Sequence, residues 1–460
     1  MSKIILLITL HLIVVGWIKA NTTDQNNVSY DIVDTVFVSA KDDLEKVLNN
    51  PNHKIVSLKN DGVYLIDKTI EIKSNITLIG NGSIIKPILQ WDKFNDEDSP
   101  LISLVGIKDV EIRDVFFDFS GEKRNMKNRV SSGILILASS NVLIKNNVFK
   151  NGGLSKTAKS IPNSPYIIIA SQDVKGGVAS VPKRYANILG SSSNNIISGN
   201  KMLNVDTETR FGIRVVTNWL STRRSRDFKY KASYNVIEKN LFEGDFIWNT
   251  VELAGGGTVQ NRVLYNLVKG KAVNNLDVDK GASYNEISYN SIVGAGLSPR
   301  HRNDRNVRCS PIMVQGMASK KYKGVGNVVK HNRIENVSNP PSQNTKYFFS
   351  SGIGVSCVDS TLVANNVLVN LYQDGNYRSG KDYGYGIIVH DDCSYVKIIN
   401  NQISRVYTAV GTNLNRDNKV NLRIENNVLN QVKVISRLSP ANSKLDIKEK
   451  NIIKGIQSSN

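Results

Sequence analysis

A tandem repeat built around asparagine constrains this chain more than any other feature. Nine copies follow the form Asn-(apolar)-x-(apolar)-x-x-Asn-x-(apolar), as in ASYNVIEKNLFEG (232–244) and ASYNEISYNSIVG (282–294). The second asparagines of the copies are Asn147, Asn200, Asn240, Asn266, Asn290, Asn332, Asn366, Asn401 and Asn427. The tightest intervals, 240 to 266 and 266 to 290, measure 26 and 24 residues. A period in this range is typical of a solenoid.

Within each copy, apolar and polar residues alternate with a period of two, which predicts short strands. A coil of three short strands per repeat fits this pattern. The asparagines then stack at one turn, where their amides bond the backbone of the neighbouring coil and where Asn tolerates a left-handed conformation. We therefore predict an all-β fold, a single right-handed parallel β-helix with an Asn ladder and capped ends. A sandwich or a propeller explains the tandem asparagine less well.

The expected organisation is one domain with a processed leader. Residues 1–20, MSKIILLITLHLIVVGWIKA, have a lysine, an apolar centre and Ala20 at a cleavage point. This pattern indicates a secretory signal peptide, with a membrane anchor as the alternative. Residues 21–60 are expected to cap the coil, 61–431 to form the β-helix, and 432–460 to form a C-terminal cap or tail, because open rung edges invite aggregation. The predicted location is extracellular or periplasmic.

The net charge of +19 and a pI near 9.6 indicate an acidic partner. Nucleic acid, an anionic membrane and an acidic polysaccharide all qualify. Export favours the polysaccharide, and no stretch after the leader is apolar enough to span a bilayer. We expect an anionic polysaccharide as partner, no nucleic acid, no integral membrane segment and a monomer. The three cysteines suggest neither a disulfide framework nor a zinc cluster; a Cys357–Cys393 bridge and three free thiols both remain open.

Another strand precedes each Asn unit, and six of these strands align by their inward apolar residues. They are GIRVVT (212–217), TVELAG (250–255), NLDVDKG (275–281), PIMVQG (311–316), GIGVSC (352–357) and GIIVHDD (386–392). The residues between the apolar ones point outward. One outward column is Arg214, Glu252, Asp277, Met313, Gly354 and Ile388; the next is Val216, Ala254, Asp279, Gln315, Ser356 and His390. Glu252, Asp277 and Asp279 should therefore be near neighbours, with Arg214 one rung away and His390 three rungs away.

Three neighbouring carboxylates repel one another, and a cation, a substrate group or a shared proton would resolve the conflict. A solvated acidic patch balanced by lysines is the plain structural alternative. Two basic loops, NWLSTRRSRDFKYK (218–231) and SPRHRNDRNVR (298–308), flank this face and resemble walls of a groove for a polyanion. The predicted substrate-binding residues are Arg223, Arg224, Arg226, Lys229, Arg300, His301, Arg302, Arg305 and Gln315.

Through its Asn repeats, most of the chain resembles the pectate-lyase-like superfamily of parallel β-helix proteins. The acidic rungs and basic groove look most similar to the alginate lyase and chondroitinase-B group. That resemblance implies Ca²⁺ held by groove carboxylates, a lysine base and an arginine on adjacent rungs; Glu252 matches an acidic position, and Lys280 or Arg214 matches the basic roles. The chain departs from the group at Ala254, where a second Glu is expected, and at Asp279, where that rung favours arginine.

The expected function is a secreted polysaccharide lyase that cleaves a uronate polymer such as alginate or pectate by β-elimination. Ca²⁺ is the candidate cofactor, on Glu252, Asp277 and Asp279, and Arg214 is an alternative partner for the substrate carboxylate. The candidate base is Lys280, with a lowered pKa, or His390. Hydrolysis by the groove carboxylates, C5 epimerisation and non-catalytic glycan binding are the alternatives, and hydrolases require carboxyl groups about 5–5.5 Å or 6.5–9.5 Å apart.

Overall fold

The structure is a computed structural model. It describes residues 35–60, 62–73, 75–91, 99–125, 127, 129–159, 164–178, 181–218, 227–296, 310–316, 323–338, 351–371, 384–390, 393–413, 421–438 and 450–454. The predicted signal peptide, residues 1–20, lies outside them. Within these residues no helix has the length and apolar character needed to cross a membrane.

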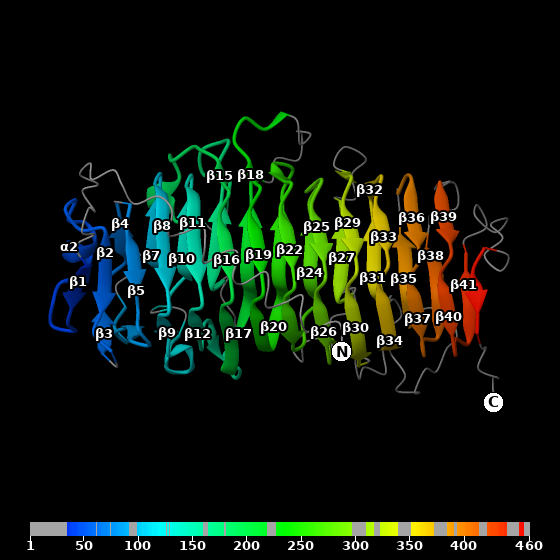
Figure 1. Ribbon diagram of the computed structural model, residues 1–460, viewed down its shortest axis with the longest axis horizontal. Coiled ribbons are helices and arrows are strands. Elements are labelled where there is room, and N and C mark those ends of the chain that lie inside the picture. The colour runs from blue at the N-terminus through cyan, green and yellow to red at the C-terminus, as the bar shows by residue number, and fades with distance from the viewer. Residues whose placement is uncertain are drawn as a thin grey trace, which may run out of the picture. The chain divides into compact units, whose positions relative to one another are not determined.

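One turn of the coil contains three short strands, as the repeat predicts. In the turn around Asn266 these are β22 (Arg262–Leu264), β23 (Leu267–Lys269) and β24 (Asn274–Asp279). Each pairs in parallel with its equivalent in the next turn, β25 (Glu286–Ser288), β26 (Ser291–Val293) and β27 (Ile312–Gln315). Figure 1 shows the successive turns side by side, coloured in chain order from blue to red. The fold is a right-handed parallel β-helix, which confirms the predicted fold class.

The equivalent strands form three continuous parallel paths. The first path is β1 (Thr35–Val38), β2 (Ile55–Leu58), β5 (Thr77–Ile79), β8 (Lys108–Arg113), β11 (Ser140–Lys145), β16 (Ile196–Ser198), β19 (Val236–Glu238), β22, β25, β29 (Val328–Lys330), β33 (Leu362–Ala364), β36 (Val396–Ile399) and β39 (Leu422–Glu425). The second is β3 (Val63–Ile66), β6 (Ile84–Pro87), β9 (Phe116–Asp118), β12 (Val148–Lys150), β17 (Lys201–Val216), β20 (Leu241–Ala254), β23, β26, β30 (Arg333–Val337), β34 (Val367–Leu371), β37 (Gln402–Ser404), β40 (Val428–Asn430) and β42 (Ile452–Ile453).

The third path carries the predicted site and is called the site sheet below. It is β4 (Ile70–Ile72), β7 (Pro100–Val105), β10 (Ser132–Leu137), β14 (Ile167–Ala170), β17, β20, β24, β27, β31 (Ser351–Ser356), β35 (Tyr385–His390), β38 (Thr408–Asn413) and β41 (Val434–Arg437). The long strands β17 and β20 run through both the second path and the site sheet, and β17 also pairs antiparallel with β13 (Leu154–Ser155).

The remaining elements are short. They are α2 (Leu44–Leu48), η2 (Gly121–Lys123), η3 (Lys183–Tyr185), β15 (Ser192–Ser193), β18 (Ala232–Ser233), β21 (Thr258–Val259), β28 (Gly324–Val325) and β32 (Val358–Asp359). Helix α2 begins after Asp43, whose side chain accepts a hydrogen bond from the Lys46 backbone. The range 21–60, expected to cap the coil, contributes α2 and also β1 and β2, so the first sheet already begins at Thr35. At the other end, β41 and β42 extend the sheets beyond residue 431.

The core fills the interior of the coil with the inward residues of each strand. In the site sheet, Ile213 pairs with Val251, Leu276 with Ile312 and Ile353 with Ile387, as the alignment predicts. All six are at most 1% exposed. Because branched aliphatic side chains stack directly above one another, the register of every rung is set by its neighbours.

The asparagines form a ladder of buried hydrogen bonds along one turn of the coil. Asn266 donates its side-chain amide to Oδ1 of Asn290 (3.0 Å) and to the carbonyl of Ile237 (2.9 Å), and its backbone N–H donates to the same Oδ1 (3.0 Å). The same pattern runs from Asn147 to Asn427 and continues to Asn451. A second ladder uses the first asparagine of the motif, in Asn195, Asn235, Asn261, Asn285 and Asn327.

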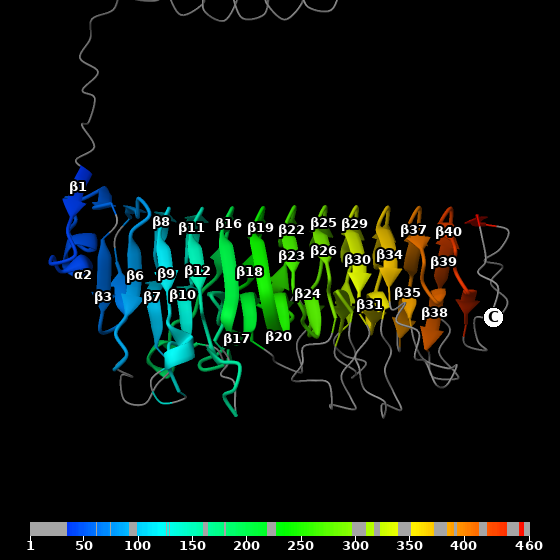
Figure 2. The ribbon, with the colours of Figure 1, turned by 90° about the horizontal axis from the view of Figure 1, so that it is seen from below.

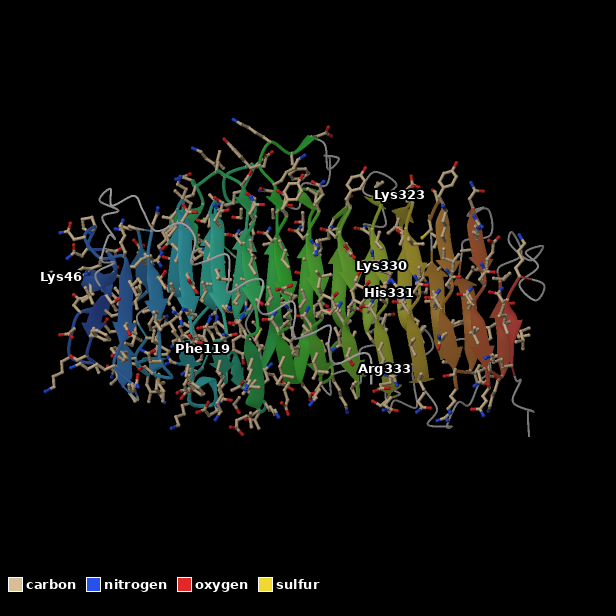
Figure 3. All side chains as sticks on the ribbon, viewed as in Figure 1. Lys46, Phe119, Lys323, Lys330, His331 and Arg333 are labelled. Carbon is tan, nitrogen blue, oxygen red and sulfur yellow. The ribbon has the colours of Figure 1, made fainter. Side chains whose placement is uncertain are left out.

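The left-handed corner lies one residue before the ladder asparagine, not on it as the sequence analysis expected. Tyr265, Tyr289 and His331 have φ values of 55°, 59° and 56°. Their rings stack on one another, with centroids 4.9 Å and 4.7 Å apart; His331 is labelled in Figure 3. The ladder asparagine instead uses its amide to satisfy the backbone of two turns.

Two of the three cysteines lie in the described part of the chain. Cys357 and Cys393 are buried and are not bridged to each other, and burial raises the pKa of Cys393 to about 12. Of the two alternatives left open by the sequence, these residues show the free thiol rather than the bridge. Cys309 lies outside the described residues.

Candidate functional site

The site sheet brings the predicted acidic residues together. In register, Arg214 of β17 pairs with Glu252 of β20, and Glu252 pairs with Asp277 of β24. Asp279 pairs with Ala254 on the neighbouring outward column. Carboxylate oxygens of Glu252, Asp277 and Asp279 all lie within 4.8 Å of one another. These three residues are called the acidic cluster; their predicted proximity is confirmed.

Arg214 neutralises one member of the acidic cluster. Its guanidinium donates from Nε to Oε2 of Glu252 (2.6 Å) and also contacts this oxygen through Nη2 (2.5 Å). The guanidinium carbon lies 4.1 Å from the ring centre of Phe211, within the range of a cation–π contact. Arg214 and Glu252 are only 2% and 3% exposed, so this is a buried ion pair. Loss of one partner would leave the other charge buried without its counter-ion.

Asp277 lies at the centre of the cluster and receives hydrogen bonds only from neutral amides among the described contacts. Asn249 (3.1 Å), Asn274 (3.3 Å) and Gln315 (3.3 Å) donate to its carboxyl oxygens. Asp277 is only 3% exposed to solvent. Burial, reinforced by the charges of Asp279 and Glu252, raises the pKa of Asp277 well above its ordinary 3.8. Asp277 therefore holds a proton more strongly than a solvated carboxyl group.

Asp279 is the most accessible acid of the cluster and is paired with the residue that follows it. Lys280 donates from Nζ to Oδ2 (2.7 Å) and from its backbone N–H to Oδ1 (2.6 Å). The side chain of Asp279 is 14% exposed. Burial raises the pKa of Asp279, and the charge of Lys280 opposes this rise. Both acids therefore bind a proton more tightly than a solvated carboxyl group, and Asp279 differs from Asp277 in having an ammonium partner.

The predicted lowering of the Lys280 pKa is wrong for this structure. Burial by itself lowers the pKa of Lys280, but the charges of Asp279, Glu252 and Asp277 and the bond to Asp279 together raise it above its usual value. Lys280 sits at a corner with φ 54°, as the sequence position suggested. Its ammonium group is therefore a counter-ion of the cluster, and it is poorly suited to accept a proton.

The other predicted site residues divide into three groups. Gln315 contacts Asp277, so it belongs to the site. His390 is buried at the end of β35, and the register Gln315–Ser356–His390 places it three rungs from Asp279, outside the acidic cluster, as expected. Lys229 is exposed and lies over the ring of Tyr230. The remaining basic residues lie outside the described part of the chain: Arg223, Arg224, Arg226, Arg300, His301, Arg302 and Arg305.

Asn249 and Asn274 also belong to the site, although neither was among the predicted residues. The two asparagines pair with each other in register, three residues before Glu252 and Asp277. Extending the alignment of TVELAG (250–255) and NLDVDKG (275–281) by one residue toward the N-terminus would have placed them side by side. Both are buried and donate amide hydrogen bonds to the cluster.

The donor set of the acidic cluster fits a hard divalent cation. Ca²⁺ binds oxygen ligands, and the cluster offers three carboxyl groups, while Gln315 directs its Nε2 donor, not its oxygen, at Asp277. The buried Oδ1 of Asn249 accepts no hydrogen bond from the described residues. However, Arg214 and Lys280 already bind two of the three acids. A metal ion would therefore compete with two built-in cations.

Comparisons with known proteins identify the fold and leave the family open. A family model described as adenovirus EB1 55K protein / large t-antigen matches residues 17–158, a range that ends before the site. No curated protein matches the chain.

Among solved structures, the tailspike protein of E. coli bacteriophage HK620, in complex with a pentasaccharide, is 12% identical. The match covers 87% of this chain and 60% of the tailspike, with a TM-score of 0.50. The surface adhesin PfbA of Streptococcus pneumoniae is 13% identical over 87% of this chain and 84% of that one (TM-score 0.45). A GH87 alpha-1,3-glucanase catalytic domain is 14% identical over 94% and 70% (TM-score 0.46). The tailspike likeness shows the fold alone.

Proposed function

We propose that this chain is a glycan-cleaving enzyme of the glycoside hydrolase kind, with the acidic cluster as its active site. The observation that carries the proposal is the pair Asp277 and Asp279. These adjacent carboxyl groups have raised pKa values, and only Asp279 has an ammonium partner. Acid–base roles are found where two titratable groups are driven toward different protonation states.

The protonation pattern assigns a role to each acid. Asp277, whose buried carboxyl group has the more strongly raised pKa of the two, donates its proton to the glycosidic oxygen as that bond breaks. Asp279, whose negative charge Lys280 stabilises, attacks the anomeric carbon, so the sugar is carried as an ester until water releases it. Water then transfers a proton back to Asp277. One carboxylate oxygen of each acid lies within 4.8 Å of those of the other two, a close spacing that suits the retaining mechanism, whose carboxyl groups are about 5–5.5 Å apart, better than the inverting one at about 6.5–9.5 Å.

Positive charge on the protein supports an anionic substrate. The chain carries a net charge of +19, which attracts polyanions over distances of about a Debye length, ~8 Å at physiological salt. The structure most similar by TM-score among those described above was solved with a bound pentasaccharide. An anionic polysaccharide outside the cell remains our proposed substrate, and the predicted basic loops remain its proposed binding walls.

β-Elimination is the second candidate, favoured by the three convergent carboxylates of the acidic cluster. Glu252, Asp277 and Asp279 would hold Ca²⁺, which when bound would neutralise a uronate carboxylate of the substrate. Lys280 next to a dication would hold its proton less tightly. Hydrolysis ranks first because Lys280 donates to Asp279 (2.7 Å) and so already serves as a counter-ion of the acids.

A product assay separates these chemistries. The purified protein is incubated with alginate, polygalacturonate and chondroitin sulfate, with and without a calcium chelator. New reducing ends without ultraviolet absorbance support hydrolysis. Absorbance from unsaturated uronic ends that disappears with the chelator would replace hydrolysis by calcium-dependent elimination. Binding without either signal, or inversion at C5 alone, would show that the cluster does not cleave glycans.

A further inference from the structure

We infer that Asn336 and Asn75 are acceptors for N-linked glycans when the chain is exported by cells that carry out this modification. Each of the two begins an Asn-x-Ser/Thr triplet, Asn336-Val-Ser and Asn75-Ile-Thr, which is the pattern that the transferase of the secretory pathway recognises. The inference concerns a modification of the chain and does not depend on the proposed glycan cleavage.

Five such triplets occur in the chain, and the structure describes three of them. Asn21 and Asn27 lie outside the described residues, whereas Asn75, Asn81 and Asn336 lie within them. All three described asparagines are exposed: Asn75 precedes β5, Asn81 lies between β5 and β6, and Asn336 is the last residue but one of β30. The buried ladder asparagines begin no triplet. A bulky glycan at a described triplet would therefore meet solvent and not the packed ladder.

A chain of hydrogen bonds fixes the amide of Asn336. Arg405 donates from Nη1 to Oδ1 of Asn370 (3.3 Å), and Nδ2 of Asn370 donates to Oδ1 of Asn336 (3.1 Å). Because a guanidinium group can only donate, the direction of both hydrogen bonds is defined. The oxygen of the Asn336 amide is therefore the bonded atom. Its Nδ2, the atom that carries an N-linked glycan, makes no hydrogen bond to a described residue.

The preceding turn of the coil leaves space beside Asn336. Figure 2 shows β26, β30 and β34 side by side, and these strands pair in parallel. Val293 of β26 pairs with Glu335, so Gly294 is the neighbour of Asn336 on one side, as Asn370 is on the other. A Cβ atom at Gly294 would meet nothing beyond its chain neighbours within 4 Å. The first sugar on Asn336 therefore has open space on the side of Gly294.

The three described triplets differ in what the amide nitrogen of the asparagine does. Asn75 makes no side-chain hydrogen bond to a described residue. Asn81, in contrast, donates from Nδ2 to Oγ of Ser57 (2.8 Å) and to the carbonyl of Leu58 (2.9 Å). An N-linked sugar replaces one of the two amide hydrogens, so a glycan at Asn81 would remove one of these bonds. The folded protein thus accommodates a glycan at Asn336 and Asn75 better than at Asn81.

The modification is a glycosyl transfer to the asparagine amide. Nδ2 attacks C1 of the first sugar of a lipid-linked oligosaccharide, the bond from C1 to the diphosphate breaks, and the lipid diphosphate leaves. The amide proton passes to a base of the transferase. Donor and enzyme belong to the secretory compartment of the producing cell, which the predicted signal peptide, residues 1–20, would let the chain enter.

The test measures the occupancy of each triplet in protein secreted by animal cells. The full chain is expressed with its own leader, and the secreted protein is treated with peptide N-glycosidase, which converts each glycosylated asparagine to aspartate. Peptide mass mapping then reads Asn21, Asn27, Asn75, Asn81 and Asn336 separately. We expect Asn336 and Asn75 to be converted in most molecules, and Asn81 to be converted several-fold less often.

Ser338 provides the matched variants, because its hydroxyl ends the triplet of Asn336. Ser338→Ala should abolish the glycan at Asn336, and Ser338→Thr should keep it. Asn370→Gln, at the same corner but outside any triplet, should leave the occupancy of Asn336 unchanged.

Secreted wild type without a glycan at Asn336 and Asn75, or wild type that is not exported, would overturn the inference. Occupancy at Asn81 equal to that at Asn336 would overturn the role given to the amide hydrogen bonds. The proposed function is tested separately by the product assay described above, so its failure leaves this inference standing.

Discussion

Asp277 shows how strongly the coil controls a single ionisable group. Its carboxyl group is surrounded by amides, two acids and the sheet beneath, and it is 3% exposed. The folded protein therefore favours the protonated form, with a pKa well above 3.8. For such a group the stabilising contribution is fully present below the unfolded pKa and is lost as pH rises through the folded pKa.

Asp277→Asn separates catalysis from stability. We expect activity to fall by about 10²–10⁴, the usual contribution of a general acid, while the melting temperature at pH 7 is equal to or above that of the wild type. The free energy of unfolding of the wild type should fall relative to that of the variant as pH rises from 4 to 8. The wild type must then either ionise a buried carboxyl group or hold a proton that the unfolded chain releases, whereas the amide of the variant does not titrate. Thermal unfolding across this range measures the difference.

Glu252→Gln is the contrasting control, because it removes the carboxylate partner of buried Arg214 and should lower the melting temperature. If the melting temperatures of Asp277→Asn and the wild type change in parallel from pH 4 to 8, the pKa of Asp277 is not raised in the folded protein.

Lys280→Gln tests whether Lys280 serves as a counter-ion or as a base. Removal of its charge should raise the pKa of Asp279 further, since Lys280 opposes the effect of burial. The acidic limb of the pH–activity profile should therefore move to higher pH, with activity retained above it. Lys280→Arg keeps the charge and should leave the limb near its wild-type position. Loss of activity at every pH in both variants would favour a base role and the elimination mechanism.

At the scale of elements, the side chain of each ladder asparagine makes hydrogen bonds with the main chain of the neighbouring turn. In a buried turn, Asn266 donates its side-chain amide to the Ile237 carbonyl and to Oδ1 of Asn290. Its own Oδ1 accepts hydrogen bonds from the backbone N–H and the side-chain amide of Asn240. Asn266→Ala leaves these groups without partners, which should lower the free energy of unfolding by about 2–4 kcal/mol. Asn370→Ala removes an exposed bond to Asn336 and should cost far less. Chemical denaturation measures both, and equal effects would show that the ladder adds little stability.

The sequence allowed the strand register to be predicted because two periodicities coincide. The repeat of the Asn motif aligns the rungs, and the alternation within each strand then decides which residues face outward; Arg214, Glu252 and Asp277 followed from these two rules alone. The Lys280 pKa was not predictable in this way, because it depends on the balance between burial and three nearby acids. The packing of Val178 and Tyr185, in the insertion between β14 and β15, on Leu135 and Ile168 was not predicted, because the insertion follows no repeat.

At the scale of the whole coil, each rung contacts mainly the rungs on either side. Stability in such solenoids is approximately a sum of local and nearest-neighbour contributions. We therefore expect amide hydrogen exchange to be slowest in central rungs, such as those of Asn240, Asn266 and Asn290, and to become faster toward β1 and β42. Native-state exchange followed by mass spectrometry checks this gradient. Uniform protection from end to end would show that the coil unfolds as one cooperative unit.

The regularity of the Asn ladder has a consequence for how such a chain changes in length. Asn401, Asn427 and Asn451 make equivalent contacts with their neighbours, at intervals of 26 and 24 residues. Removal of one complete turn would place the side-chain amide of one ladder asparagine beside Oδ1 of the next one, in the geometry that every neighbouring pair already has. Duplication or loss of whole turns therefore leaves the backbone pairing intact. Loss or gain of a partial turn would break it. Lineages of this protein should therefore differ in length by whole turns outside the segment from β14 to β27, which carries the acidic cluster.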